Sequence, residues 1–142
     1  MDWTLELVVV PASDLDRSKA FYLDQVGFDL VVDHSAGPDF RVVQLNPKGS
    51  TCGIAMMKVN NDMAPGTLHG LHLCVDDIVA AREELVGRGV DASEPFWFSE
   101  TGQQPGLDPE RRSYATFFTF KDPDANTWLV QEKHADNADA HA

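Results

Sequence analysis

The segment Leu7-Val-Val-Val-Pro-Ala-Ser-Asp-Leu-Asp-Arg-Ser-Lys-Ala-Phe-Tyr22 has a counterpart later in the chain, Gly70-Leu-His-Leu-Cys-Val-Asp-Asp-Ile-Val-Ala-Ala-Arg-Glu-Glu-Leu85. The offset is 63 residues, from Asp14 to Asp77. In each copy an apolar run typical of a strand leads to an aspartate that can cap a helix, and a glycine follows the helix. Internal repetition of this kind predicts a fold built from two copies of one module.

Apolar runs separated by turn residues predict the other strands of each copy. In the first copy we expect strands at 5–10, 28–32, 40–45 and 51–57, with a helix that begins at Asp14. In the second we expect them at 71–75, 96–98, 114–120 and 128–131, with a helix that begins at Asp76 or Asp77. The order β-α-β-β-β therefore occurs twice, which predicts an α+β fold.

The predicted boundaries follow from these patterns. Module one covers residues 4–58, a linker covers 59–68 and module two covers 69–133, all within one domain. The acidic segment 134–142 is expected to be disordered, because it has no large apolar residue. Residues 99–113 show no periodicity, which favours a functional lid over a plain surface loop.

Composition limits the classes of partner. The chain has 142 residues, 43% of them hydrophobic, which suffices for one well-filled core. Its formal charge of −12 opposes binding to nucleic acid and to anionic membranes. Without an apolar run of membrane-spanning length or a secretion signal, we expect a cytoplasmic protein with Cys52 and Cys74 reduced.

Three motifs resemble the vicinal oxygen chelate superfamily, the group of glyoxalase I, bleomycin resistance proteins and extradiol dioxygenases. They are Ser13-Asp-Leu-Asp-Arg-Ser-Lys-Ala-Phe-Tyr22, Val75-Asp-Asp-Ile78 and Asp122-Pro-Asp-Ala-Asn126, and the resemblance covers residues 4–133. It implies a cupped, mostly antiparallel, barrel-like sheet of eight strands with the helices outside. It also implies a ligand or metal in the concave interior, and a homodimer.

Enzymes of that superfamily bind a divalent metal through His, Glu or Gln on the first and last strands of each module. The matching positions here hold Leu7, Gly70 and Leu129, and the looser match at the end of module one offers Gly53, Ala55 or Met57. None of these side chains is a metal ligand of the usual kind. We therefore predict no metal and no other cofactor.

The alternative is a displaced site for a divalent ion such as Mn, Fe, Ni or Zn. Alternation along a strand puts His72 and Cys74 on the face of position 70, and Gln131 on the face of position 129. These three side chains come from only two strands and make a partial ligand set. His72 is better interpreted as a group that orients a ligand, or as a hydrogen-bonded core histidine.

The remaining signals favour a small-molecule cavity. Aromatic residues concentrate in module two, and an apolar cavity with few polar groups is the usual make-up of such a site. The predicted ligand-binding residues are Gln44, Met57, His72, Cys74, Trp97, Tyr114, Phe118 and Gln131. Arg41, Arg111 and Arg112 either offset the acidic surface or form a cationic fork for an anionic ligand.

The sequence therefore favours metal-independent binding of an apolar or aromatic small molecule, as in superfamily members that sequester antibiotics. One alternative is an enzyme, a lyase, isomerase or dioxygenase, that uses a displaced metal or His72 as a general base. Another is an interaction protein whose interior is filled by side chains. Asp122 to Asn126 imitates a calcium loop, but Thr127 and Lys133 replace its required Gly and Glu, so we predict a turn.

Overall fold

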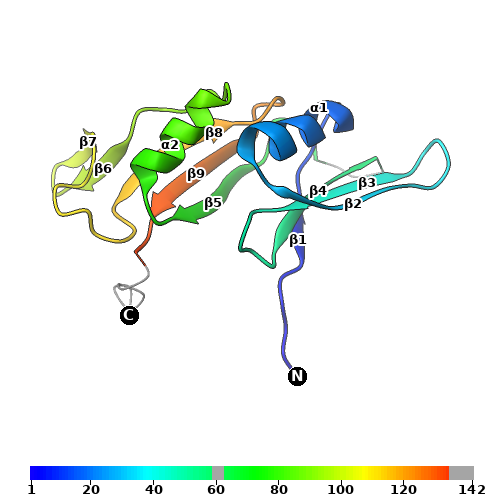
Figure 1. Ribbon diagram of the computed structural model, residues 1–142, viewed down its shortest axis with the longest axis horizontal. Helices are drawn as coiled ribbons and strands as arrows, with labels where there is room; N and C mark the ends of the chain where they lie inside the picture. The colour runs from blue at the N-terminus through cyan, green and yellow to red at the C-terminus, as the bar shows by residue number, and fades with distance from the viewer. Residues whose placement is uncertain (59–62, 135–142) are drawn as a thin grey trace. The chain divides into compact units, whose positions relative to one another are not determined.

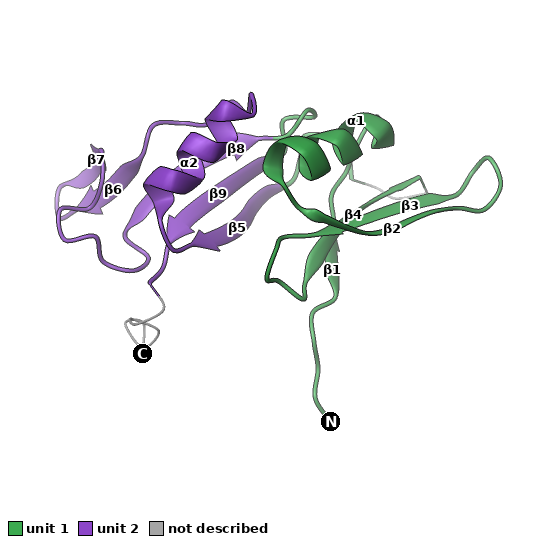
Figure 2. Ribbon diagram, viewed as in Figure 1, with its two compact units in different colours: residues 1–68, 122–126 green, residues 69–121, 127–142 purple. Residues whose placement is uncertain are grey.

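The computed structural model describes residues 1–58 and 63–134 (Figure 1). The chain divides into two compact units, which are coloured separately in Figure 2. Unit 1 comprises Met1–Leu68 together with Asp122–Asn126, and unit 2 comprises His69–Lys121 together with Thr127–Ala142. Residues 59–62 of the predicted linker and residues 135–142 of the predicted tail lie outside the described residues.

Unit 1 is one β-α-β-β-β module. Its elements are β1 Leu7–Val9, α1 Leu15–Ala20, the π-helix η1 Phe21–Val26, β2 Asp29–Ser35, β3 Arg41–Asn46 and β4 Gly53–Lys58. The sheet order is β1-β4-β3-β2, with β1 parallel to β4 and the other pairs antiparallel. Asp14 caps α1 by accepting a hydrogen bond from the Arg17 amide, and Gly27 ends η1 with a φ of 90°, as predicted for both residues.

Side chains alternate between the two faces of the unit 1 sheet, and one of these faces packs against α1. Val43, Leu45, Ile54 and Met56 are buried and share the face that α1 covers. The π-helix adds Phe21 and Tyr22, consecutive residues that are both buried, with ring centroids 5.1 Å apart. This apolar layer fixes α1 on the sheet.

Unit 2 repeats the module with one extra strand. Its elements are β5 His69–Val75, α2 Ile78–Gly87, β6 Phe96–Ser99, β7 Gly102–Pro105, β8 Thr116–Lys121 and β9 Thr127–Glu132. The sheet order is β5-β9-β8-β6-β7, with β5 parallel to β9 and the other pairs antiparallel. Asp77 caps α2, and Ile78 and Leu85 of that helix are buried.

The core of unit 2 lies between α2 and one face of the sheet. Phe118, Phe120, Trp128 and Val130 are buried on that face, and the rings of Phe120 and Trp128 stack at 5.8 Å with a 4° angle between planes. Figure 1 shows α2 lying across β8 and β9. The α+β class and the duplicated module are confirmed.

Within residues 1–58 and 63–134 the strands number nine instead of eight and form two open sheets of four and five strands. The additional strand, β7, occupies part of the segment 99–113 that we predicted to be a loop without secondary structure. Among the described strands its one partner is β6, and it lies at the edge of the sheet. Proline is tolerated at an edge, where an N–H is not needed for a second partner, and this explains why Gly102-Gln-Gln-Pro105 can form a strand there.

The turn Asp122–Asn126 joins β8 to β9 but packs within unit 1. As predicted, it bonds its own backbone, because Asp122 Oδ1 accepts hydrogen bonds from the amides of Asp124 and Asn126. It also makes buried side-chain bonds: Tyr22 Oη donates to Asp122 Oδ2 at 2.7 Å, and Asn126 Nδ2 donates to the Pro11 carbonyl at 2.9 Å. These buried hydrogen bonds fix the turn to the rest of unit 1.

Candidate functional site

The sheet face of unit 2 that α2 leaves uncovered is the candidate site, and we call it the open face. Strand register assigns its members: His72 lies opposite Leu129, Cys74 opposite Gln131, and Gln131 opposite Phe117 on the other side. Thr119 is opposite Leu129, and Phe96 is opposite Phe117. His72 and Cys74 are exposed, and Leu129, Gln131 and Phe117 are half-buried, so side chains of both polarities remain accessible.

Three phenylalanines form the apolar part of the open face. The ring centroid of Phe96 lies 5.9 Å from that of Phe98 and 5.7 Å from that of Phe117, and the last two are 5.8 Å apart. Phe98 remains 55% exposed. Aromatic pairs at these separations attract one another, and an exposed ring in such a cluster offers a surface on which a planar ligand can stack.

Polar groups border this apolar cluster on β5 and β9. Gln131 Nε2 donates a hydrogen bond to Cys74 Sγ at 3.3 Å. Lys133 Nζ lies 5.7 Å from the centre of the Tyr114 ring, and a hydrogen bond with Tyr114 raises the pKa of that ammonium group. The open face therefore presents an amide, a thiol and an imidazole beside aromatic and aliphatic surface.

A pocket of about 600 Å³ adjoins the phenylalanines. It is lined by Phe96 and Thr119 of the open face, by the segment Ser93 to Pro95, and by Gln103, Gln104 and Pro105 of β7. Its volume is within the range that small-molecule sites occupy. The residues of β7 that the sequence left without an assigned structure thus form one wall of a cavity.

The loop after β7 is held by buried carboxylates. Glu132 is fully buried and accepts hydrogen bonds from Arg111 and from the Ile78 amide at the start of α2. Burial by itself raises the pKa of Glu132, but the Arg111 and Ile78 hydrogen bonds outweigh it and leave that pKa below its usual value. Arg111 therefore serves structure, as does Arg112, whose guanidinium binds buried Asp108 and lowers the pKa of that carboxyl group.

The predicted site residues divide among four places. His72, Cys74 and Gln131 lie together on the open face, and Tyr114 lies just before β8 with a φ of 63°. Phe118 is fully buried on the α2 side of β8, and Trp97, opposite Thr116, shares that side. The prediction omitted Phe96, Phe98 and Phe117, which face the open side.

Gln44 and Met57 belong to unit 1. Gln44 is 7% exposed, and its Nε2 donates to Glu6 Oε1 at 3.2 Å. Met57 is half-buried near the end of β4, opposite Val42. Within unit 1 these two side chains share the face opposite α1, which is lined mainly by small and aliphatic residues.

The residues at the superfamily's metal positions do not fit a metal. Leu7 and Leu129 are hydrocarbon side chains on β1 and β9. Gly70 has a φ of 107°, a conformation that strains any residue with a side chain. At Gly53 a Cβ atom would clash with Asn46 Oδ1, so no ligating side chain can replace that glycine without rearrangement. The absence of a cofactor stays a prediction that rests on this donor chemistry.

Comparison with known proteins agrees with this architecture. The sequence profile of the Glyoxalase/Bleomycin resistance protein/Dioxygenase superfamily matches residues 4–130. The crystal structure of TnmS3, described as an antibiotic binding protein from Streptomyces sp. CB03234, is 31% identical, with a TM-score of 0.73 over 93% of this chain and 97% of that one.

Two further relatives bear on the assignment. A glyoxalase/bleomycin resistance protein of known structure from the same Streptomyces strain is 32% identical, with a TM-score of 0.69 over 90% of this chain and 99% of that one. The uncharacterized protein YetH of Bacillus subtilis (strain 168) is 28% identical over 130 residues, which are 88% of this chain and 94% of YetH. These similarities extend over both copies of the repeat.

Proposed function

This chain belongs to the Glyoxalase/Bleomycin resistance protein/Dioxygenase superfamily, and we propose that it binds a mostly apolar, aromatic small molecule without the help of a metal ion. The observation that carries the proposal is the cluster of Phe96, Phe98 and Phe117 on the open face of unit 2. Soluble proteins seldom leave several large apolar side chains together at a surface unless something covers them.

The polar groups of the open face suit orientation of a ligand. The Gln131 amide has both donors and an acceptor, and the His72 imidazole can donate or accept at either ring nitrogen. A few directional groups beside a stacking surface fix how a planar ligand lies without adding much affinity. Binding would then depend mainly on burial of the ligand's apolar area.

Sequestration of an antibiotic is the specific form of the proposal. It is supported by similarity to TnmS3, described as an antibiotic binding protein, over nearly the whole of both chains. It is also supported by the hydrocarbon side chains at the metal positions, since binding of an intact compound needs no Lewis acid.

The test uses 1-anilinonaphthalene-8-sulfonate and bleomycin as probes, titrated into the purified protein with and without a chelator. We expect Phe117→Ala to weaken binding of the aromatic probe about fivefold, because a stacked aromatic pair contributes roughly 1 kcal/mol. Val86→Ala is the matched control, since Val86 is an exposed apolar residue on α2. Loss of binding on chelation, or equal weakening by both variants, would contradict the proposal.

An enzyme is the second candidate, favoured by the exposed His72 imidazole on the open face. Replacement of His72 by Ala abolishes turnover if His72 is a general base, and only weakens probe binding if the protein sequesters its ligand. Assembly as a homodimer stays a prediction from the resemblance, and a cytoplasmic location stays a prediction from the sequence pattern. Among the described helices none is long and apolar enough to span a membrane.

A further inference from the structure

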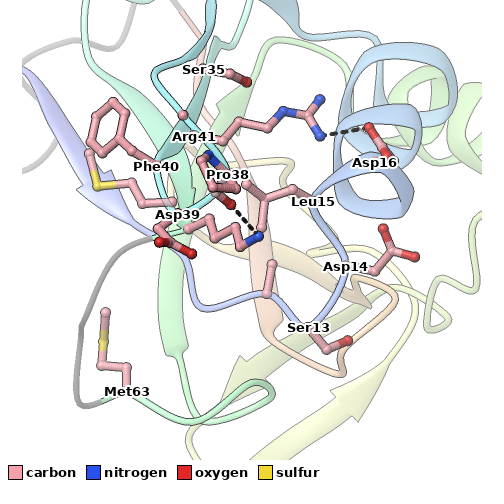
Figure 3. Close-up of a pocket in the computed structure, with 14 residues that line it drawn as sticks. Ser13, Asp14, Leu15, Asp16, Ser35, Pro38, Asp39, Phe40, Arg41 and Met63 are labelled. Atoms are coloured by element: carbon pink, nitrogen blue, oxygen red, sulfur yellow. Dashed lines mark hydrogen bonds and ion pairs between the residues drawn. The ribbon is translucent and has the colours of Figure 1, made fainter.

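Unit 1 holds a separate pocket of about 720 Å³, a volume typical of small-molecule sites. Its walls come from residues 12–16 at the start of α1, from Ser35 and residues 37–41 of the β2–β3 hairpin, from Met57 and Lys58 at the end of β4, and from Met63 (Figure 3). None of these residues belongs to the open face of unit 2, so this pocket is independent of the function proposed above.

The cations of this pocket are already engaged. Arg41 donates two hydrogen bonds to Asp33, at 3.1 and 3.0 Å, and a third to Asp16 at 2.7 Å, as Figure 3 shows for Asp16. Lys58 Nζ donates to the Pro38 carbonyl at 2.7 Å. The positive charge of Arg41 is thus shared by two carboxylates, and Lys58 is directed to the hairpin backbone.

The carboxylates of the pocket can accept further hydrogen bonds and pair with a further positive charge. Three carboxylates, those of Asp14, Asp16 and Asp39, line the pocket, together with the cations Arg41 and Lys58. Asp33, which does not line the pocket, also pairs with Arg41. The Asp16 side chain is 81% exposed despite its bond to Arg41. Asp39 has no hydrogen bond or ion pair within the part of the chain that the structure describes. An ionised carboxylate is an acceptor only, so the free capacity here suits a donor with positive charge.

Apolar surface stands beside these carboxylates. Phe40 adjoins Asp39 on the hairpin and is 36% exposed, and Leu15, Met57 and Met63 contribute aliphatic and thioether surface. An aromatic face attracts cations, and methionine adapts to ligands of different shape. The pocket therefore combines a negative rim with an adaptable apolar wall.

We propose that this pocket binds a small organic cation, an ammonium or guanidinium group on an apolar body. The charged group lies beside Asp39, the carboxylate without a partner among the described residues, and the body packs against Phe40 and Met57. A cationic ligand gains from the pocket carboxylates without displacing Arg41 or Lys58 from their partners, whereas an anionic ligand would have to compete with those partners.

The test measures binding of three probes of similar size to the full chain by isothermal titration calorimetry: 2-phenylethylammonium, neutral 2-phenylethanol and anionic phenylacetate. We expect the cation to bind most tightly. Asp39→Asn should weaken its binding about threefold, the usual scale for an exposed ion pair. Phe40→Leu should weaken it about as much, because the aromatic face is lost.

Asp24→Asn is the matched control, because it removes the same charge from an exposed position of unit 1 that does not line the pocket. Equal weakening by Asp24→Asn and Asp39→Asn would show only nonspecific attraction to an acidic protein and would overturn the proposal. So would equal affinity for the alcohol or tighter binding of phenylacetate. Phe117→Ala should leave the preference for the cation over the alcohol unchanged, which separates this site from the open face.

Discussion

Unit 1 and unit 2 are two copies of one module that differ mainly on the sheet face left uncovered by their helix. In unit 1 that face carries Leu7, Ala55 and Met57, with Gln44 tied to Glu6. In unit 2 it carries three clustered phenylalanines together with His72, Cys74 and Gln131. The comparison teaches that the two copies share an apolar sheet face that packs against the helix and differ in the chemistry of the opposite face.

The two copies also differ in how buried carboxylates are used. In unit 2, Glu132 joins the loop after β7 to the start of α2 through Arg111. In unit 1, Asp122 joins the β8–β9 turn to Tyr22 of η1 through a neutral hydroxyl donor. The partner is charged in unit 2 and neutral in unit 1. Its removal should therefore lower the free energy of unfolding by different amounts in the two units.

The largest effect should follow from removal of the charged partner. We expect Arg111→Ala to lower the free energy of unfolding by about 3 kcal/mol, because Glu132 would remain buried without its cation. Urea denaturation measures this change. Arg88→Ala is the control, since the Arg88–Glu84 pair lies at the surface of α2 and is worth less than about 1 kcal/mol. Similar losses for the two variants would refute the structural role of Glu132.

A smaller effect should follow in unit 1. Tyr22→Phe removes the hydroxyl that donates to Asp122, yet the carboxylate keeps the Asn126 side chain and two backbone amides. We expect a loss of about 1–2 kcal/mol in the free energy of unfolding, the usual cost of one buried hydrogen bond to a charged group. Tyr114→Phe, at a half-buried position of unit 2, serves as the comparison in thermal unfolding and should change stability less. An unchanged free energy of unfolding in Tyr22→Phe would mean that the Tyr22–Asp122 hydrogen bond does not stabilise unit 1.

The ion pairs of Asp33 with Lys19 and Arg41 in unit 1 should make the stability of the protein depend on pH. Hydrogen bonds from Arg41 and Lys19 hold the pKa of Asp33 well below its ordinary value of 3.8. Such a depressed pKa stabilises the fold above the unfolded value, and this contribution is lost as pH falls through the lower folded value. Because Asp33 is partly exposed, we expect Asp33→Asn to remove only about 0.5–1 kcal/mol of the acid-induced loss. Urea titrations at neutral pH and near pH 3 test this, and an unchanged acid-induced loss in the variant would contradict it.

The sequence predicted the modules well because local signals at their ends are strong. Asp14 and Asp77 cap helices as expected, and Gly27 has the left-handed conformation that favours glycine. It did not predict β7, since Gly102-Gln-Gln-Pro105 has low strand propensity and pairs only through its position beside β6. Nor did it predict that η1 would continue α1 as a π-helix.

The candidate site was predicted only in part, and the phase of β8 explains why. Phe117 and Phe118 are adjacent, so either phase of alternation places one phenylalanine on the open face. We expected Phe118 to contact ligand, but the pairing of β8 with β9 puts it opposite Val130 in the core and turns Phe117 outward. His72, Cys74 and Gln131 shared one face as predicted, because alternation along β5 and β9 is regular through those positions.

By itself, the sequence determined the duplicated module, the superfamily and the absence of metal-binding side chains at Leu7, Gly70 and Leu129, because these depend on residue type and spacing along the chain. Only the tertiary structure decided which phenylalanines face outward, which carboxylates are buried and which stay available at the pocket of unit 1. Those properties depend on strand register and on partners far apart in sequence, as Arg41 with Asp16 and Arg111 with Glu132 illustrate. Residue type supplies the chemistry, and packing decides where it is exposed.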